Sequence, residues 1–174
     1  SDKRELLIDL IEGQMVSCGI VFTRTKHAAN RLAKQLSKVG IPSDSIHGDK
    51  SQTARTKALA SFKKGDVFVL VATDIASRGI DVEDITHVFN FDLPNEPEVY
   101  IHRIGRTARA GREGLAYSFC DETESGYLVG IQQLLGEEIE VLEDQPYHFE
   151  KARPKPGQKP GRVKGSPGGG RSRR

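Results

Sequence analysis

The sequence predicts an α/β fold in which a parallel β-sheet is covered by helices on both faces. The first observation is the order of the patterns: short β-rich runs alternate with stretches of helical apolar spacing, and the connections between them are short. The second is that the run CGIVFT at 18–23 is apolar through its centre, which suits a strand buried on both faces. Ligands of such folds gather at the loops beyond the carboxyl ends of the strands.

Five stretches have the apolar spacing of a helix that buries one face. The second of them is followed by Gly40, which is placed to end it, and the third begins with Ser51, whose hydroxyl can cap it. The expected helices span 3–12, 26–39, 51–64, 95–104 and 123–135.

Five β-rich segments lie between these helices. The segment VFVLVAT at 67–73 is the richest in strand-forming residues and is predicted to be the central strand. The segment LAYSFC at 115–120 is predicted to be the last strand of the core. The other expected strands span 18–23, the residues near 45–46, and 86–92.

Composition places most of the chain among soluble globular proteins. Of 174 residues, 36% are hydrophobic and 29% charged. No apolar run approaches the roughly 18 residues of a membrane span, and the charged start has no signal-peptide core. The only methionine is Met15, so we expect a segment of a longer protein. Cys18 and Cys120 suit a reducing, cytoplasmic setting with both thiols free and buried, and the five histidines lack metal-ligand spacing.

Charge is divided unevenly along the chain. The net charge is +2, but residues 151–174 hold nine Lys or Arg and no acid, which leaves 17 basic against 24 acidic residues in 1–150. This last stretch is rich in Pro and Gly and has nothing to bury, so disorder is expected there. We therefore predict a folded domain at 1–145 and a disordered basic tail at 146–174.

The most informative segment is HRIGRTARAGR at 102–112. Four arginines in eleven residues are hard to place in a core, because each guanidinium stays charged and presents five donors. Gly105 and Gly111 let the backbone turn between them. Such a density of forked cations suits a multiply charged anion, for which a nucleotide triphosphate is the obvious candidate. A solvated basic loop is the alternative for this segment taken alone.

Three further loops argue against that alternative. ATDIASRGID at 72–81 directly follows the expected central strand, IHGDKSQTAR at 46–55 leads into the third helix, and IVFTRTK at 20–26 ends the first strand in hydroxyl and basic residues. Each of the four loops is rich in Arg, Thr or Gly. By topology they converge on one rim of the sheet.

These segments resemble motifs IV (IVFTRTK), IVa (HGDKSQTAR), V (ATDIASRGID) and VI (HRIGRTARAGR) of the DEAD-box RNA helicases, with NFDLP at 90–94 between the last two. Their order and approximate spacing also match, over about residues 1–145. The resemblance implies the C-terminal RecA-like lobe of an ATP-dependent RNA helicase. SFCDETE and EDQPY are similar to the bacterial RhlE-like branch, and Ala108 stands where many family members have Gly.

By this resemblance, Arg106 and Arg109 are arginine fingers that reach a triphosphate on the other lobe, and Asp81 accepts from the ribose. The nucleotide-facing residues that it implies are Arg78, Gly79, Asp81, Arg106 and Arg109. The network expected between the two lobes consists of Arg78, His102 and Arg103. Local salt bridges to nearby acids are the alternative for the members of this network.

The resemblance also implies a surface for the RNA backbone. Hydroxyls, amides and exposed backbone N–H groups contact phosphate and sugar rather than base edges, and the 2′-hydroxyl could let such a surface prefer RNA over DNA. The implied RNA-binding residues are Thr25, Gly48, Gln52, Arg55, Thr73 and Asp74.

The sequence has neither a GxxxxGK[ST] phosphate loop nor an Asp-Glu-Ala-Asp run, so the lobe resembles a P-loop NTPase without its own P-loop. We expect ATP with magnesium to be held mainly by an N-terminal RecA-like lobe of the same protein, and the isolated chain to bind no cofactor and hydrolyse no ATP. Closure of both lobes on RNA would unwind short duplexes. The alternatives are a stand-alone RNA-binding or partner-docking module without catalysis, and a related helicase acting on DNA. No membrane association or oligomer is predicted.

Overall fold

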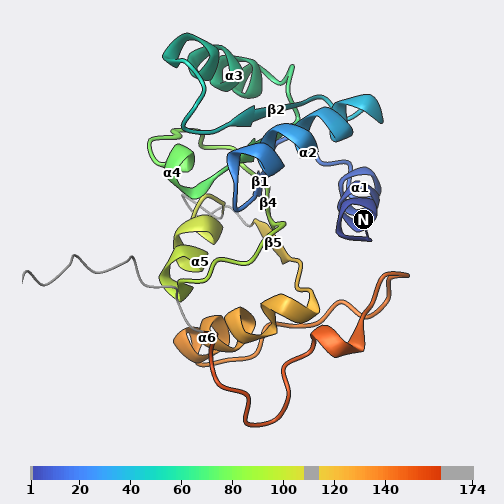
Figure 1. The fold of residues 1–174 in the computed structure, drawn as a ribbon. Helices are drawn as coiled ribbons and strands as arrows, with labels where there is room; N and C mark the ends of the chain where they lie inside the picture. The colour runs from blue at the N-terminus through green and yellow to red at the C-terminus, as the bar shows by residue number, and fades with distance from the viewer. Residues whose placement is uncertain (1, 108–113, 162–174) are drawn as a thin grey trace, which may run out of the picture.

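A five-stranded parallel sheet forms the centre of the structure, a computed structural model that describes residues 2–107 and 114–161 (Figure 1). The strand order is β2-β3-β1-β4-β5, and every pairing is parallel. The predicted RecA-like α/β architecture is therefore confirmed. The strands are β1 (Gly19–Phe22), β2 (Ser43–Ile46), β3 (Val69–Ala72), β4 (His87–Asn90) and β5 (Leu115–Ser118).

The central strand of the sheet is β1. It pairs with β3 on one side and β4 on the other, whereas β3 lies between β1 and β2. The prediction that 67–73 forms the central strand is therefore wrong. Both strands are buried at all four positions, so the apolar pattern cannot distinguish the centre of the sheet from the position beside it. The strand predicted to close the core, β5, is an edge strand with exposed or half-exposed residues.

The helices begin and end within a few residues of the predicted bounds. Ser51 caps the third helix by accepting a hydrogen bond from the backbone N–H of Ala54 (3.1 Å), and Gly40 follows the second with φ of 89°. The helices are α1 (Asp2–Gly13), α2 (Lys26–Lys38), α3 (Gln52–Lys64), α4 (Asp74–Ser77), α5 (Pro97–Ile104) and α6 (Ser125–Leu135), with 3-10 helices η1 (Glu122–Glu124) and η2 (Glu150–Ala152). The sequence did not predict α4, because one helical turn is too short to show an apolar period.

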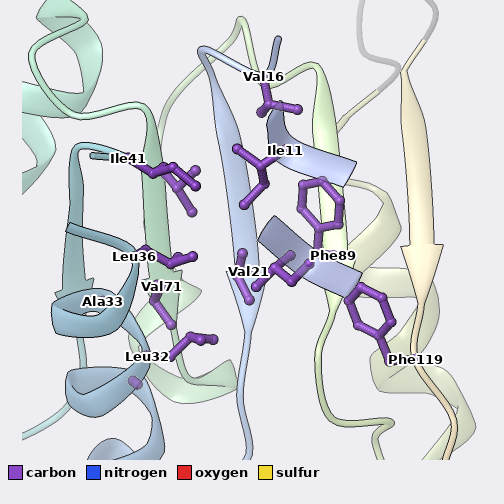
Figure 2. Packing of buried hydrophobic residues seen from close by; sticks show 13 residues of the cluster. Ile11, Val16, Val21, Leu32, Ala33, Leu36, Ile41, Val71, Phe89 and Phe119 are labelled. Carbon is purple, nitrogen blue, oxygen red and sulfur yellow. The ribbon is translucent and has the colours of Figure 1, made fainter. Parts of the chain in front are cut away.

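Alternate side chains of each strand enter two different cores, one on each face of the sheet. Val21 and Phe89 pack with side chains of α1 and α2 on one face, as Figure 2 shows. Ile20 and Leu70 point to the opposite face, where Phe62 of α3 packs against them. Helices therefore cover both faces, and the carboxyl ends of the strands form one rim of the sheet.

The chain beyond α6 turns back along that helix. The backbone N–H of Gly161 donates to Gly126 O (2.9 Å), and a Cβ built on Gly126 would lie 3.0 Å from the Gly161 backbone. Composition alone does not reveal such a backbone-to-backbone contact. The division into a folded domain at 1–145 and a disordered tail at 146–174 stays a prediction. Residues 162–174 of the predicted tail lie outside the described part of the chain.

Both cysteines are free thiols, and each is half-buried. Burial raises the pKa of Cys120 to about 12, and nearby Glu124 acts in the same direction. A thiol with so high a pKa is a poor nucleophile. Across 2–107 and 114–161, His, Cys, Asp and Glu side chains form no group of three or more that could hold a metal ion. In that same part of the chain, every helix is too short or too polar to span a bilayer.

Candidate functional site

The carboxyl ends of the three strands on one side of the sheet lie in register. Ile46, Ala72 and Phe22 are paired at the ends of β2, β3 and β1. The backbone ladder continues one residue further, because Thr73 N donates to Ile46 O (3.3 Å) and Thr23 N to Ala72 O (3.0 Å). The loops after these three strands therefore start side by side on one rim, as the topology predicts.

Four of the six residues predicted to contact RNA follow the ends of these strands or begin helix α3. Thr25, Gly48 and Gln52 are exposed, and Thr73 is half-buried. Thr25 also caps α2, because its Oγ1 accepts from the backbone N–H of Ala28 (3.1 Å). The rim therefore presents hydroxyl, amide and open backbone groups together, which are the groups that bind phosphate and sugar.

Gly48 has room for a side chain that it lacks. A Cβ built at this position meets no atom within 4 Å, and the backbone is not in the left-handed region. Gly79, by contrast, has φ of 80°, a conformation that favours glycine in its own right. The described residues around Gly48 do not require a glycine there, so its open backbone is suited to close approach by another molecule.

Asp74 and Arg103 form an ion pair within the lobe. Arg103 is only 3% exposed. It donates from Nε to Asp74 Oδ1 (2.6 Å), from Nη2 to Asp74 Oδ2 (2.8 Å) and from Nη1 to Asp92 O (2.6 Å). Its guanidinium lies 5.1 Å from the ring centroid of Phe22. The local salt bridge that the sequence left open as an alternative is the arrangement found, because an arginine buried beneath the rim needs an anion within reach.

Arg55 is also directed into the protein. Its Nη2 donates to Ala76 O (2.7 Å) and to Arg78 O (2.9 Å). Gln52, one turn earlier on α3, is exposed as expected. Arg55 thus joins α3 to the end of α4, a connection that the sequence could not reveal because the two carbonyls lie 21 and 23 residues away along the chain.

Four of the five predicted nucleotide-facing residues lie at or beside the turn after α4. Arg78, Gly79 and Asp81 are exposed in this turn. Arg106 arrives from the end of α5 with a partly exposed side chain, and its Nη1 donates to the carbonyl of Ile80 (3.4 Å). The structure therefore brings one predicted arginine finger beside the predicted ribose acceptor, although they are far apart in sequence.

The second predicted arginine finger, Arg109, lies outside the described residues, but the ends of its loop are anchored. Thr107 Oγ1 donates to Ile85 O (2.7 Å). A Cβ built on Gly114 would fall 1.8 Å from Thr107 Oγ1. Thr107 and Gly114 therefore touch, and only glycine fits there. The sequence analysis missed this contact. His102, predicted in the network between lobes, is exposed on α5.

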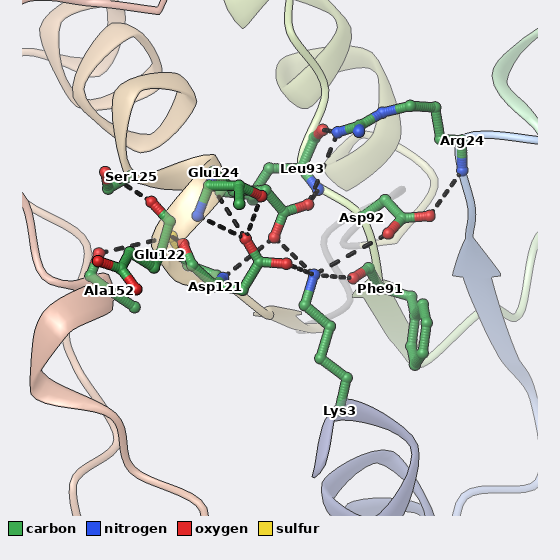
Figure 3. Close-up of polar contacts among 12 residues, drawn as sticks. Lys3, Arg24, Phe91, Asp92, Leu93, Asp121, Glu122, Glu124, Ser125 and Ala152 are labelled. Carbon is green, nitrogen blue, oxygen red and sulfur yellow. Dashed lines mark hydrogen bonds and ion pairs between the residues drawn. The ribbon is translucent and has the colours of Figure 1, made fainter. Parts of the chain in front are cut away.

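A charged network that the sequence analysis missed lies at the ends of β1, β4 and β5 (Figure 3). Buried Glu124 accepts from Lys3 Nζ (2.5 Å) and from the backbone N–H of Leu93 (3.0 Å). Arg24 donates from Nη2 to Leu93 O (3.0 Å) and lies 3.6 Å from Glu124. Glu124 follows Asp121 by three residues in a capping box, which is a signal that could have revealed it. On this half of the rim the protein's own charged groups bind one another.

Comparison with protein families gives a match to the helicase conserved C-terminal domain over residues 2–111. The chain is 42% identical over 142 residues to the ATP-dependent RNA helicase CshA of Listeria monocytogenes, an alignment that covers 82% of this chain and 27% of CshA. The chain spans about a quarter of the length of the curated relatives that it matches.

Two solved structures have the same fold at similar identity. The Escherichia coli DEAD-box protein SrmB, bound to regulator of ribonuclease activity A, gives a TM-score of 0.77 at 37% identity, covering 92% of this chain and 91% of that one. Saccharomyces cerevisiae Dbp5, bound to RNA and ADP BeF3, gives a TM-score of 0.72 at 36% identity, covering 79% of this chain and 37% of Dbp5.

Proposed function

Because the chain belongs to the helicase conserved C-terminal domain family, as the C-terminal RecA-like lobe of a DEAD-box RNA helicase, we propose that it works as one of the two lobes of an ATP-driven RNA-unwinding enzyme. The observation that carries this proposal is the position of Arg106 beside the turn that holds Asp81, next to a rim of open backbone and hydroxyl groups. One lobe thus offers separate groups for a phosphate chain and for a nucleic-acid backbone.

The nucleotide side of the lobe would act through charge. ATP bound between the lobes supplies the phosphoryl group that is transferred to water. Arg106 and Arg109 would stabilise the negative charge that develops on that group, and the Asp81 carboxylate suits a pair of ribose hydroxyls. Guanidinium groups fit phosphate rather than a metal ion, and the described residues contain no cluster of metal ligands. Magnesium and most of the nucleotide would therefore be held by the N-terminal lobe.

The rim of the lobe would bind the sugar-phosphate backbone of RNA without regard to base sequence. Thr25, Gly48, Gln52 and Thr73 offer hydroxyl, amide and backbone groups along the rim. Arg55 would contribute indirectly, because its bonds to the end of α4 tie α3 to the nucleotide-facing turn. Closure of the two lobes on ATP and RNA would bend the bound strand and separate a short duplex. The RhlE-like branch remains a prediction within this family.

The isolated chain should hydrolyse ATP no faster than background, because it carries arginine fingers but no phosphate loop. Joined to its N-terminal lobe, the same chain should show RNA-stimulated turnover. Phosphate release measured with and without single-stranded RNA checks both statements. RNA-stimulated hydrolysis by the pure isolated chain would show that the nucleotide site is located differently and would refute the proposal.

Gly48→Ala tests the RNA surface. The added methyl group has room in the free lobe, so the free energy of unfolding should be unchanged or slightly raised. Against bound RNA the same group would crowd the backbone, and we expect affinity for single-stranded RNA, measured in the two-lobe protein with a nonhydrolysable ATP analogue, to fall about tenfold or more, roughly 1.4 kcal/mol.

Gly13→Ala is the matched control for this experiment. Gly13 ends α1 and also has no atom within 4 Å of a built Cβ, with a backbone outside the left-handed region. It should leave RNA affinity unchanged. Equal affinities for the two alanine variants would remove Gly48 from the RNA surface.

A further inference from the structure

His47 joins the loop that carries Gly48 to helix α2. It is the first residue after β2, and it is only 6% exposed. Its Nε2 lies 3.0 Å from Asn30 Oδ1 on α2, and its Nδ1 lies 3.3 Å from the backbone N of Asp49. The imidazole thus uses both ring nitrogens to span a helix and a loop.

The hydrogen-bond partners determine which nitrogen carries the proton. Asn30 Oδ1 accepts from Ser45 Oγ (2.6 Å) as well, and an amide oxygen can only accept. His47 Nε2 must therefore donate, which leaves the lone pair of Nδ1 to accept the Asp49 N–H. A proton added to Nδ1 would face that N–H and break the contact.

The surroundings favour the neutral ring that this arrangement needs. Burial lowers the pKa of His47, and the positive charge of Lys50 lowers it further, while Asp49 acts in the opposite direction. Lys26 and His27, on α2, also lower it. These effects together lower the pKa and favour the neutral ring, whose proton the hydrogen-bond partners place on Nε2.

The loop is held at further points around Gly48. Lys50 N donates to His47 O (3.2 Å), and Lys50 Nζ lies 2.7 Å from Asp44 Oδ1. Lys26 Nζ donates to Asp49 Oδ2 (2.5 Å), an exposed pair that contributes little on its own. Of these connections, the one made by His47 is buried. The exposed backbone of Gly48 lies between His47 and Asp49, which are both held by hydrogen bonds.

We propose that His47 is a positioning residue for RNA binding, which holds the Gly48 backbone in the conformation that receives a phosphate or ribose. This inference rests on the proposed RNA contact of Gly48. A binding surface that is ordered beforehand loses less conformational entropy when the ligand arrives. His47 itself, being buried, would not touch the RNA.

The test uses the full-length protein, ATP and single-stranded oligouridine RNA. The RNA concentration that gives half-maximal stimulation of ATP hydrolysis is measured together with the turnover at saturating RNA. His47→Ala removes both hydrogen bonds, and the half-saturating RNA concentration should rise about fivefold to tenfold. Turnover at saturating RNA should stay near the wild-type value. A general loss of stability would instead lower the turnover as well.

Two further variants at the same site separate the contributions. His47→Asn places an amide oxygen where Nδ1 stands, so it can still accept from Asp49 N, and it should recover part of the lost RNA affinity. Ser45→Ala is the matched control, because it removes the other hydrogen bond to Asn30 Oδ1 and leaves both His47 contacts in place. It should bind RNA like the wild type.

The possible outcomes are distinguishable. If Gly48→Ala weakens RNA binding and His47→Ala does not, this inference is overturned while the proposed function stands. If RNA does not stimulate the wild type, the proposed function fails and takes the inference with it. Should His47→Ala not fold, Asn30→Ala removes the Nε2 acceptor without touching the loop. A rise in half-saturating RNA for that variant supports the inference, and wild-type behaviour overturns it.

Discussion

Arg106→Ala in the two-lobe protein should lower the turnover of RNA-stimulated ATP hydrolysis by about 10³-fold or more, which corresponds to roughly 4 kcal/mol of transition-state stabilisation. The reason is that a fixed guanidinium stabilises charge on the transferring phosphoryl group more strongly than water does. ATP affinity should change much less, because the rest of the nucleotide is held by the other lobe. Phosphate release and binding of a fluorescent ATP analogue measure the two effects separately.

Two variants sharpen this prediction. Arg106→Lys keeps the charge but loses the fork of donors, so its turnover should lie between those of the wild type and Arg106→Ala. Arg31→Ala removes an exposed arginine from α2, and it should leave turnover unchanged. A turnover for Arg106→Ala within threefold of the wild type would exclude Arg106 as an arginine finger.

Asp74→Ala should destabilise the fold by about 3 kcal/mol or more, because it leaves the buried Arg103 without its carboxylate. Two neutral acceptors would remain for this guanidinium. They are the amide oxygen Asn90 Oδ1 at 3.3 Å and the backbone oxygen Asp92 O at 2.6 Å. Urea unfolding followed by far-ultraviolet circular dichroism measures the change in the free energy of unfolding.

A double-mutant cycle distinguishes the ion pair from simple loss of packing. Arg103→Met keeps much of the apolar volume beside Phe22, and the double variant with Asp74→Ala no longer contains a buried charge. We expect it to be more stable than the sum of the two single changes implies. Additive losses would show that the pair is not coupled. A loss below about 1 kcal/mol for Asp74→Ala would show that the neutral acceptors suffice.

The alternation of patterns along the chain was enough to predict the parallel sheet, its helices and the rim where the motif loops meet. Each of these follows from local sequence, because the apolar period and the capping residues belong to single segments. Ser51, for example, caps α3 through a residue only three positions away. The positions of Gly48 and Thr73 on one rim follow in turn, because the carboxyl ends of parallel strands share an edge.

The partners of charged side chains could not be predicted from local sequence. The sequence predicts Arg55 and Asp74 on an RNA surface and Arg103 between lobes, but it does not reveal the contacts that all three make within the lobe. A motif shows that an arginine is present at a loop, but the direction of its guanidinium depends on which carbonyl or carboxylate the fold brings near. Those acceptors lie 21 to 29 residues away along the chain.

Local segments of ten or so residues were enough to predict the fold class, the family resemblance and the loops on which the predicted site residues lie. Packing between elements was needed to show that β1 is the central strand, that Glu124 binds the backbone of Leu93, and that His47 connects the Gly48 loop to α2. Such features depend on side chains that meet across different elements, and their energies exist only once those elements are packed together.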